Sequence, residues 1–249
     1  MSGAPSHVRA LVRRHVPAAH RQLVAVVRRR LRDMASGTRF GADVGGLDWP
    51  AYASIDQTVT PGPLQANKLT NLRLACSALD GRLLHPDGRW SFWHLVGRPS
   101  AARGYTEGRT IKDGRLVRDV GGGLCQLSSL LYHLALVGGL EVIERHAHTL
   151  DIYRDEERYM PLGSDATVVW GFKDLRLRNP YVSQVAMSCS VDADRVRASL
   201  HDASGLLRPR GVAFASVDSN DSTVTVTTVI DGNAAIVTDY ERRPGMTLE

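Results

Sequence analysis

The chain has 249 residues, of which 43% are hydrophobic and 23% are charged. This composition predicts an ordinary globular protein and excludes collagen-like, coiled-coil and disordered chains. The three cysteines, Cys76, Cys125 and Cys189, are odd in number and far apart in sequence, so the spacing predicts neither a disulfide framework nor a CxxC metal pair. The N-terminal segment has no apolar stretch of the length that a secretory signal or membrane span requires. We therefore expect a cytoplasmic protein.

The formal net charge of +5 is concentrated near the N-terminus, where residues 1–33 carry eight arginines and one acidic residue. Apolar residues recur there at helical spacing, at Val12, Val16, Leu23, Val27, Leu31 and Met34. Pro17 should kink or restart the helix. We expect residues 1–36 to form a basic amphipathic helical arm. The arm either binds an anionic surface or an acidic partner, or packs on the body with a solvated charged face; the near-neutral remainder does not predict nucleic-acid binding.

The remaining pattern predicts helices first and strands later. Residues 37–50 are rich in glycine and read as a linker, and Gln65–Leu79 reads as a helix that Gly81 ends. The sequences HPDG at 85–88 and KDGR at 112–115 predict turns, and alternating strands follow over 185–240, with a DGN hairpin turn at 231–233. We therefore predict one α+β body over about residues 55–240, with an antiparallel sheet and packed helices.

The segment 119–153 carries the strongest chemical signal. Leucines at helical spacing and the Gly138-Gly139 pair predict a helix from about Cys125 to Val137. At the first turn of a helix, unpaired amides and the positive dipole end lower a thiol pKa and favour a nucleophilic thiolate. The preceding Gly121, Gly122 and Gly123 allow backbone amides to approach a substrate and form an oxyanion hole.

Two histidines follow at the distance that brings the chain back to Cys125. A helix of about 13 residues carries the chain roughly 20 Å, and a strand beginning with LEVIE regains that distance near residue 146. His146 and His148 are two residues apart and would share one face of that strand. Either imidazole could take the thiol proton, and a carboxylate on the next predicted strand, Asp165 or Asp174, could orient the ring. Asp165 is preferred because it lies at the start of that strand.

Other interpretations of these residues remain open. A lone cysteine in a leucine-rich helix is usually an inert core residue, and an HxH pair on a strand is often a surface pair or half of a metal site. The three glycines resemble a phosphate cradle but lack the P-loop lysine and spacing, and they do not match GxGxxG, so nucleotide binding is not expected.

The segments GGGLCQLSSLLYHLAL, GGLEVIERHAHT and GSDATVVWGFKDLRLRN resemble the VanW family, named from a protein of glycopeptide-resistance gene clusters. An earlier block that begins NLRLACSALDGRLLHPDGRW adds to the resemblance, which covers about residues 65–179. Many relatives are extracellular, whereas this chain is similar to a short soluble form. The order of Cys on a helix start, His on the next strand and Asp on the one after is also similar to that of transglutaminase-like cysteine enzymes.

The resemblance places the family motifs on Cys125, Gln126, His148 and Asp165. Together with the spacing of the thiol, imidazole and carboxylate, these motifs favour the hypothesis of a cysteine-dependent amide hydrolase or acyltransferase acting on a peptide-like or amino-acid-derived small molecule. Cys125 would be the nucleophile, His148 the base, with His146 as the alternative, and Asp165 the orienting group. Gln126 or the glycine-loop amides would stabilise the oxyanion. Further substrate contacts are expected at Gly121, Gly122, Gly123, Ser128 and Asp174, with no metal or cofactor. The alternative is a non-enzymatic accessory or binding protein associated with cell-wall, antibiotic-resistance or biosynthetic gene clusters.

Overall fold

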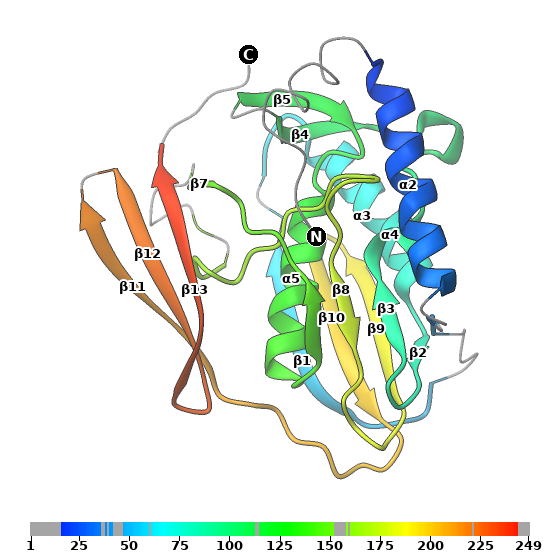
Figure 1. The fold of residues 1–249 in the computed structure, drawn as a ribbon, viewed down its shortest axis with the longest axis vertical. Coiled ribbons are helices and arrows are strands. Elements are labelled where there is room, and N and C mark those ends of the chain that lie inside the picture. Colours follow the sequence, from blue (N-terminus) through cyan, green and yellow to red (C-terminus); the bar gives the residue numbers. More distant parts are fainter. Residues whose placement is uncertain are drawn as a thin grey trace.

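The computed structural model describes residues 16–35, 38, 40–41, 47–59, 61–112, 115–151, 158, 160–220 and 222–243. The fold is α+β, as the order of predicted elements indicates, but the strands form several small, mainly antiparallel sheets rather than the one antiparallel sheet predicted. Helices pack against a central sheet, and a second sheet made from the C-terminal strands stands beside this body (Figure 1). Within the described residues, no helix is both long and apolar enough to cross a membrane.

The central sheet has the order β1-β10-β9-β2, and every neighbouring pair is antiparallel. Its strands are β1 (Ala51–Thr58), β2 (Arg82–Leu84), β9 (Val185–Asp192) and β10 (Arg195–Asp202). Helix α3 (Gln65–Leu79) packs on β9, and helix α5 (Leu124–Val137) packs on β1 and β10. Leu127, Leu130, Leu131 and Leu134 of α5 are fully buried, which is the core role that their spacing predicts.

Short elements connect these layers. The sheet β3-β8-β6 is formed by β3 (Arg89–Ser91), β6 (Glu141–Glu144) and β8 (Arg176–Arg178), and β4 (Glu107–Lys112) pairs with β5 (Arg115–Val120) as a hairpin. The short helices are α4 (Phe92–Val96) and η1 (Ala101–Arg103). The HPDG turn is confirmed between β2 and β3, where Asp87 has a φ of 58°. The KDGR hairpin is also confirmed, although residues 113–114 lie outside the described residues.

The C-terminal strands divide between two sheets. β9 and β10 belong to the central sheet, whereas β11 (Val212–Asn220), β12 (Thr223–Ile230) and β13 (Asn233–Arg242) form a second sheet. The β12–β13 connection is the predicted hairpin. The short β7 (Leu150–Asp151) joins β13 in parallel, which brings the chain just after His148 against the second sheet.

The N-terminal helix α2 (Ala18–Ala35) begins directly after Pro17 and lies along the outside of the body (Figure 1). Its polar side faces the body: Arg29 bonds both carboxylate oxygens of Glu144 at 2.7 Å, and Asp33 accepts from Arg176 at 2.5 Å. Its predicted apolar stripe faces outward instead, with Leu23 62%, Val27 45%, Leu31 58% and Met34 77% exposed. Residues 1–15 of the predicted arm lie outside the described residues.

Two of the three cysteines meet in the core although they are far apart in sequence. The thiols of Cys76 on α3 and Cys189 on β9 are both buried, and their sulfur atoms are 2.7 Å apart. Sequence spacing did not predict this contact, because it arises from the packing of α3 on the central sheet. Cys125 is separate from this pair and is only partly buried.

Candidate active site

The glycine loop before α5 is fixed by close backbone packing. Gly121 and Gly123 have φ of 83° and 96°, which an L side chain rarely adopts. A Cβ atom on Gly122 would lie 2.1 Å from the carbonyl carbon of Gly108 on β4, so the two backbones touch. Asn71 of α3 donates to the Gly122 carbonyl at 2.9 Å. The loop is therefore held between β4 and α3, and it delivers the chain into the first turn of α5.

Cys125 is the second residue of α5, as predicted. Its sulfur lies 3.8 Å from the Thr167 hydroxyl and 3.7 Å from the Val168 carbonyl oxygen. The hydroxyl can donate to a thiolate, whereas the carbonyl can only accept from a neutral thiol. Within the described part of the chain, the amide N–H of Cys125 has no hydrogen-bond partner. This amide is available to a ligand at the helix start.

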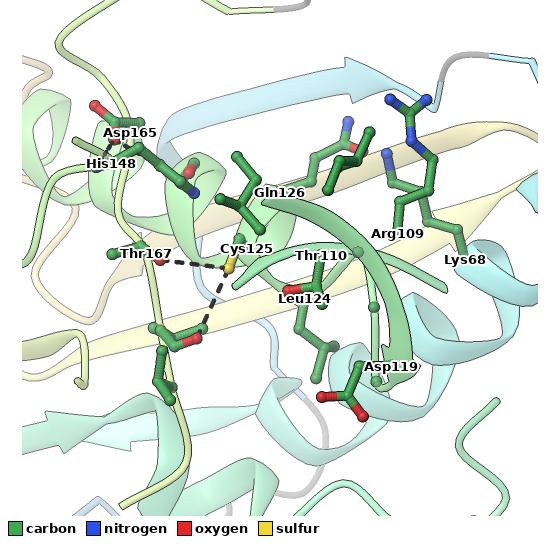
Figure 2. Close-up of a pocket in the computed structure, with 18 of the residues that line it drawn as sticks. Lys68, Arg109, Thr110, Asp119, Leu124, Cys125, Gln126, His148, Asp165 and Thr167 are labelled. Carbon is green, nitrogen blue, oxygen red and sulfur yellow. Dashed lines mark hydrogen bonds and ion pairs between the residues drawn. The ribbon is translucent and has the colours of Figure 1, made fainter. Parts of the chain in front are cut away.

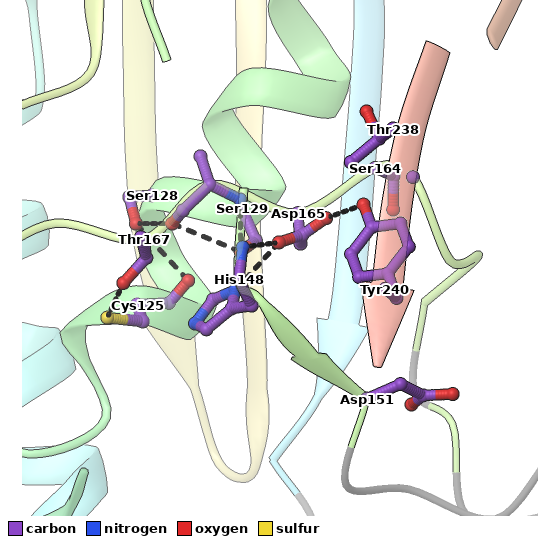
Figure 3. A network of polar contacts seen from close by, with 12 residues as sticks. Cys125, Ser128, Ser129, His148, Asp151, Ser164, Asp165, Thr167, Thr238 and Tyr240 are labelled. Carbon is purple, nitrogen blue, oxygen red and sulfur yellow. Dashed lines mark hydrogen bonds and ion pairs between the residues drawn. The ribbon is translucent and has the colours of Figure 1, made fainter. Parts of the chain in front are cut away.

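His148 lies between Cys125 and Asp165. Its Nδ1 is 2.7 Å from Asp165 Oδ2, and its backbone N–H donates to the same oxygen at 2.6 Å. Because an ionised carboxylate only accepts, Nδ1 carries the proton, and Nε2 is the nitrogen left for the thiol. Figure 3 shows the ring turned toward Cys125, with Asp165 behind it. The three side chains therefore stand in the order thiol, imidazole and carboxylate.

Asp165 is held from its other side by two residues that the sequence patterns did not indicate. Arg145 Nη2 donates to Asp165 Oδ1 at 3.0 Å, and the hydroxyl of Tyr240 on β13 donates to the same oxygen. Burial would raise the pKa of Asp165, but His148 and then Arg145 lower it to about 2. Arg145 could have been suspected from its place beside the HAH motif. Tyr240 has no such signal, since it comes from a strand 75 residues further along the chain.

The charges of Cys125 and His148 are coupled. Burial raises the pKa of the Cys125 thiol, but the nearby imidazole and the Thr167 hydroxyl outweigh burial, so the net effect is a lowered pKa. Burial lowers the pKa of His148, but Asp165 and then Cys125 outweigh it and raise the pKa to about 10. Both shifts favour a thiolate–imidazolium pair, the state in which a thiol is nucleophilic.

His146 and Asp174, the alternative residues, lie elsewhere. The segment after β6 is irregular, so the two histidines do not share a strand face: His146 Nε2 is 2.9 Å from Glu144. Asp165 also lies in an irregular segment rather than at the start of a strand. Of the strand predicted to begin there, only Arg176–Arg178 forms a strand, β8. Asp174 accepts from the Ser91 hydroxyl at 2.6 Å and from the Trp93 amide at 3.1 Å. Neither His146 nor Asp174 lines the cavity at Cys125.

Gln126 and Ser128 are buried and hydrogen-bond to neighbouring segments of the chain. The amide Nε2 of Gln126 donates to the Thr58 carbonyl at 3.2 Å, so its donor end is engaged, while its Oε1 has no hydrogen-bond partner within the described residues. This leaves Gln126 better suited to accept an N–H than to donate to an oxyanion. Ser128 donates to the Ala166 carbonyl at 2.6 Å and does not line the cavity. It ties α5 to the Asp165 segment.

A cavity of about 1030 Å³ opens beside Cys125. Its wall includes the glycine loop, Gln126, His148, Asp165 and Thr167, together with two cations that the sequence patterns did not indicate, Lys68 and Arg109 (Figure 2). The volume is at the upper end of the range for small-molecule sites. Among the described residues, no group of three His, Cys, Asp or Glu side chains is placed to hold a metal ion.

Comparison with known proteins agrees with the sequence motifs at this site. The chain is 37% identical over 111 residues to the uncharacterized protein YoaR of Bacillus subtilis (strain 168), covering 45% of this chain and 35% of that protein. It is also 37% identical over 115 residues to the vancomycin B-type resistance protein VanW of Enterococcus faecalis (strain ATCC 700802 / V583), covering 46% and 42%. The chain thus spans less than half the length of these relatives, and no solved structure matches it significantly. The family model described as VanW like protein matches residues 67–201, so this chain belongs to the VanW family.

Proposed function

We propose that the chain is a cysteine-dependent amide hydrolase or acyltransferase that acts on a peptide-like or amino-acid-derived substrate. The observation that carries the proposal is His148, which contacts Asp165 through Nδ1 and turns its other nitrogen toward Cys125 in the wall of a substrate-sized cavity. This order of groups is the one used by thiol and hydroxyl nucleophiles on unrelated folds, including the transglutaminase-like enzymes that the motif order resembles.

The geometry supports a two-step acyl transfer. The Cys125 thiolate attacks the carbonyl carbon, and the free N–H of Cys125 donates to the oxyanion that forms. The imidazolium of His148 gives its proton to the leaving amine as the C–N bond breaks, which leaves a thioester on Cys125. Water or an amine then attacks the thioester while His148 takes its proton. The C–S bond breaks, which releases the acid or the new amide and restores the thiolate–imidazolium pair. Asp165 keeps its negative charge throughout and stabilises the imidazolium.

An acyl-enzyme trap tests the proposal. The full chain is incubated with 4-nitrophenyl esters of N-acyl amino acids, and the protein is analysed by intact mass and peptide mapping. We expect an acyl group on Cys125, release of nitrophenol, and loss of both in Cys125→Ser. His148→Gln should slow acylation by about 100-fold or more, the usual contribution of a general base, whereas Cys189→Ala serves as the matched thiol control. Acylation of Cys125 at the same rate in His148→Gln would refute the proposal.

A second candidate function is an accessory or binding protein, and the exposed face of α2 favours it. Leu23, Val27, Leu31 and Met34 form an outward apolar stripe, and Arg28, Arg30 and Arg32 are exposed beside it. Such a helix suits an anionic membrane surface, into which the apolar side chains insert while arginines contact headgroups. Cosedimentation with vesicles containing about 30% anionic lipid tests this, with Leu23→Ser/Leu31→Ser as the variant expected to lose binding. Equal vesicle binding by that variant would exclude the apolar stripe as the membrane-binding surface.

The proposed substrate class is based on the name of one relative. One relative is named a vancomycin B-type resistance protein, and we extend to this chain the proposal that its peptide-like substrate, or its binding partner, belongs to cell-wall or antibiotic-related metabolism. The test is whether cell-wall peptides compete with thiol labelling of Cys125. Competition by unrelated peptides at equal concentration would remove the cell-wall assignment without affecting the chemistry.

A further inference from the structure

Two buried thiols lie in direct contact in the core, and the chemistry proposed at Cys125 does not use them. Cys76 lies on α3 and Cys189 on β9, and their sulfur atoms are 2.7 Å apart. Non-bonded heavy atoms pack at about 3.5–4.0 Å, so these two sulfur atoms approach more closely than atoms in an ordinary packing contact. Their separation is nearer to that of a covalent bond between sulfur atoms, about 2.05 Å.

The two thiols meet because each lies on the core face of its element. Cys76 is buried with Leu72 and Leu79, which are four and three residues away and so share one face of α3. Cys189 is buried with Met187, two residues earlier on the same face of β9. Helix α3 packs on β9, so the contact follows from the regular packing of these two elements.

Asp80 joins the backbones of the two cysteines. Its N–H donates to the Cys76 carbonyl at 2.8 Å, at the end of α3. Its Oδ1 accepts from the Cys189 N–H at 2.9 Å. Because one residue holds both backbones, a bond between the sulfur atoms requires adjustment of the side chains rather than a change in how α3 packs on the sheet. A disulfide placed in this way avoids the strain that comes with movement of the backbone.

A metal site and a reactive dithiol are the other uses of a cysteine pair. Protein zinc sites use three or four ligands from the chain, and in the part of the chain that the structure describes no third His, Cys, Asp or Glu completes such a group. Contact with the Cys76 thiol and burial both raise the pKa of Cys189 well above its ordinary value. Cys189 therefore has little of the thiolate character that a reactive cysteine needs.

We propose that Cys76 and Cys189 form a disulfide that fastens α3 to β9, made during folding by exchange with a small disulfide such as oxidised glutathione. Before the core closes, the thiolate of one cysteine attacks a sulfur atom of the oxidant, whose S–S bond breaks to release one glutathione. The thiolate of the other cysteine attacks the mixed disulfide, forms the protein S–S bond and releases the second glutathione. Two protein thiols are oxidised, one glutathione disulfide is reduced, and the two protons pass to the glutathione thiolates.

The bond would act on the helix that holds the glycine loop. The two cysteines are 113 residues apart in sequence, so joining them removes much of the conformational freedom of the unfolded chain. Helix α3 also carries the buried Asn71, which donates to the Gly122 carbonyl at 2.9 Å. The disulfide therefore stabilises the helix against which the loop before Cys125 is packed.

Disulfide mapping tests the proposal in the full chain with Cys125→Ser, which removes the partly buried thiol that could compete for the oxidant. The reduced, unfolded chain is refolded with oxidised and reduced glutathione, and the monomer is isolated by gel filtration. Remaining thiols are alkylated before peptides are mapped without reduction. We expect the Cys76 and Cys189 peptides to be linked and the intact protein to have lost two hydrogen atoms. Alkylated or glutathionylated thiols at both positions in the refolded monomer would overturn the proposal.

Melting temperatures of the oxidised and reduced forms provide the second measurement. The oxidised form should unfold at a temperature about 5–15 °C higher than the form reduced beforehand, because the bond closes a long loop. Cys189→Ala in the same background leaves Cys76 without its partner and should melt at one temperature after either treatment. Equal melting of the two forms would contradict a bond that fastens α3 to β9. The same shift in Cys189→Ala would assign the effect of oxidation to other groups and would also overturn the proposal.

Discussion

The chemistry proposed at Cys125 relies on a chain of hydrogen bonds that ends at Tyr240. The tyrosine hydroxyl and Arg145 hold one oxygen of Asp165, and His148 holds the other. Donors on both oxygens restrict rotation of the carboxylate, which favours one orientation of the imidazole ring. In the proposed mechanism Tyr240 and Arg145 are therefore positioning residues, because they contact Asp165 rather than the thiol.

Tyr240→Phe should be more destabilising than an ordinary loss of a tyrosine hydroxyl. The Tyr240 hydroxyl donates to a charged carboxylate, for which we expect a loss of about 1.5–3 kcal/mol in the free energy of unfolding. Tyr52→Phe is the matched control, because Tyr52 donates at 2.9 Å to the neutral carbonyl of Gly138 and should cost about 0.5–1.5 kcal/mol. Urea unfolding of both variants measures the difference. An equal or smaller loss of unfolding free energy in Tyr240→Phe would mean that the hydrogen bond to Asp165 stabilises the fold no more than a bond to a neutral carbonyl.

Gly122→Ala should be among the most damaging single-methyl additions in the chain. The added Cβ would meet backbone atoms of Gly108 at 2.1–2.5 Å, and backbone cannot move aside as a flexible side chain can. We expect a loss of more than about 3 kcal/mol, or no soluble protein. Gly62→Ala provides the control, because its Cβ would meet nothing within 4 Å. Near-wild-type thermal stability of Gly122→Ala would show that β4 and the glycine loop are not packed as described.

At the scale of elements, the sequence patterns predicted the helices, turns and hairpins whose position is set by residues near one another in sequence. Helix α5, the HPDG turn and the β4–β5 and β12–β13 hairpins follow from leucine spacing and turn residues, and each lies where predicted. The segments that carry His148 and Asp165 were predicted as strands but are irregular. Their shape is set by long-range bonds, such as Arg145 to the Asp165 carbonyl at 2.8 Å and Thr167 N–H to the His146 carbonyl at 2.7 Å, which no local pattern encodes.

The same limit explains the orientation of α2. Its periodicity correctly predicted an amphipathic helix, but a pattern cannot tell which face meets the body. The charged pairs of Arg29 with Glu144 and Asp33 with Arg176 select the polar face, while the apolar stripe remains exposed.

Deletion of residues 1–35 should leave the body folded. The deletion removes the two charged pairs of α2, which are partly exposed and worth about 1 kcal/mol each or less. We expect an unfolding transition that remains cooperative and shifts downward by a few degrees, at about 2–4 °C per kcal/mol for a chain of this length. Circular dichroism and gel filtration measure this. An insoluble or molten truncated chain would mean that α2 belongs to the core.

At the scale of the whole molecule, the candidate site exists only because distant segments converge. The thiol comes from α5, the base and carboxylate from two irregular segments, Tyr240 from the second sheet, and Lys68 from α3. From the lengths of the helix and the following segment, the sequence analysis expected the chain to return to the level of Cys125 near residue 146. One of the two histidines there, His148, does lie beside Cys125. The sequence could not indicate Tyr240, Lys68 or Arg109, because their contribution depends on how whole sheets and helices pack.

The stability of the molecule should vary with pH in opposite directions at two carboxylates. Asp165 has a lowered pKa, so its ionised form stabilises the fold above the unfolded pKa of about 4, and this contribution is lost as the pH falls toward about 2. Burial raises the pKa of Asp174 to about 6 despite its bonds to Ser91 and Trp93. Its neutral form is favoured in the folded state, so stability is lost as the pH rises from about 4 to 6.

Asp174→Asn isolates the second effect. Stability of the wild type relative to this variant should fall by about 1–3 kcal/mol between pH 4 and pH 6, the range in which the wild-type carboxyl ionises against burial. Urea unfolding at intervals across this range measures the difference. The absolute stability of the variant will also change, because an amide has one acceptor oxygen in place of the two that Ser91 and Trp93 use, so only the slope is informative. A parallel pH dependence in the two proteins would contradict the raised pKa.

The pH dependence of Cys125 alkylation tests the central claim most directly. Iodoacetamide reacts with the thiolate, so the rate at Cys125 against pH gives the thiol pKa in wild type and in His148→Gln. We predict a wild-type midpoint below the ordinary thiol value near 8.5, and a higher midpoint in His148→Gln, because burial then acts without the imidazole. Cys76 and Cys189 should react only after unfolding, since both are buried. The same midpoint in both proteins, at or above the ordinary value, would show that His148 does not ionise Cys125 and would contradict the proposed catalytic pair.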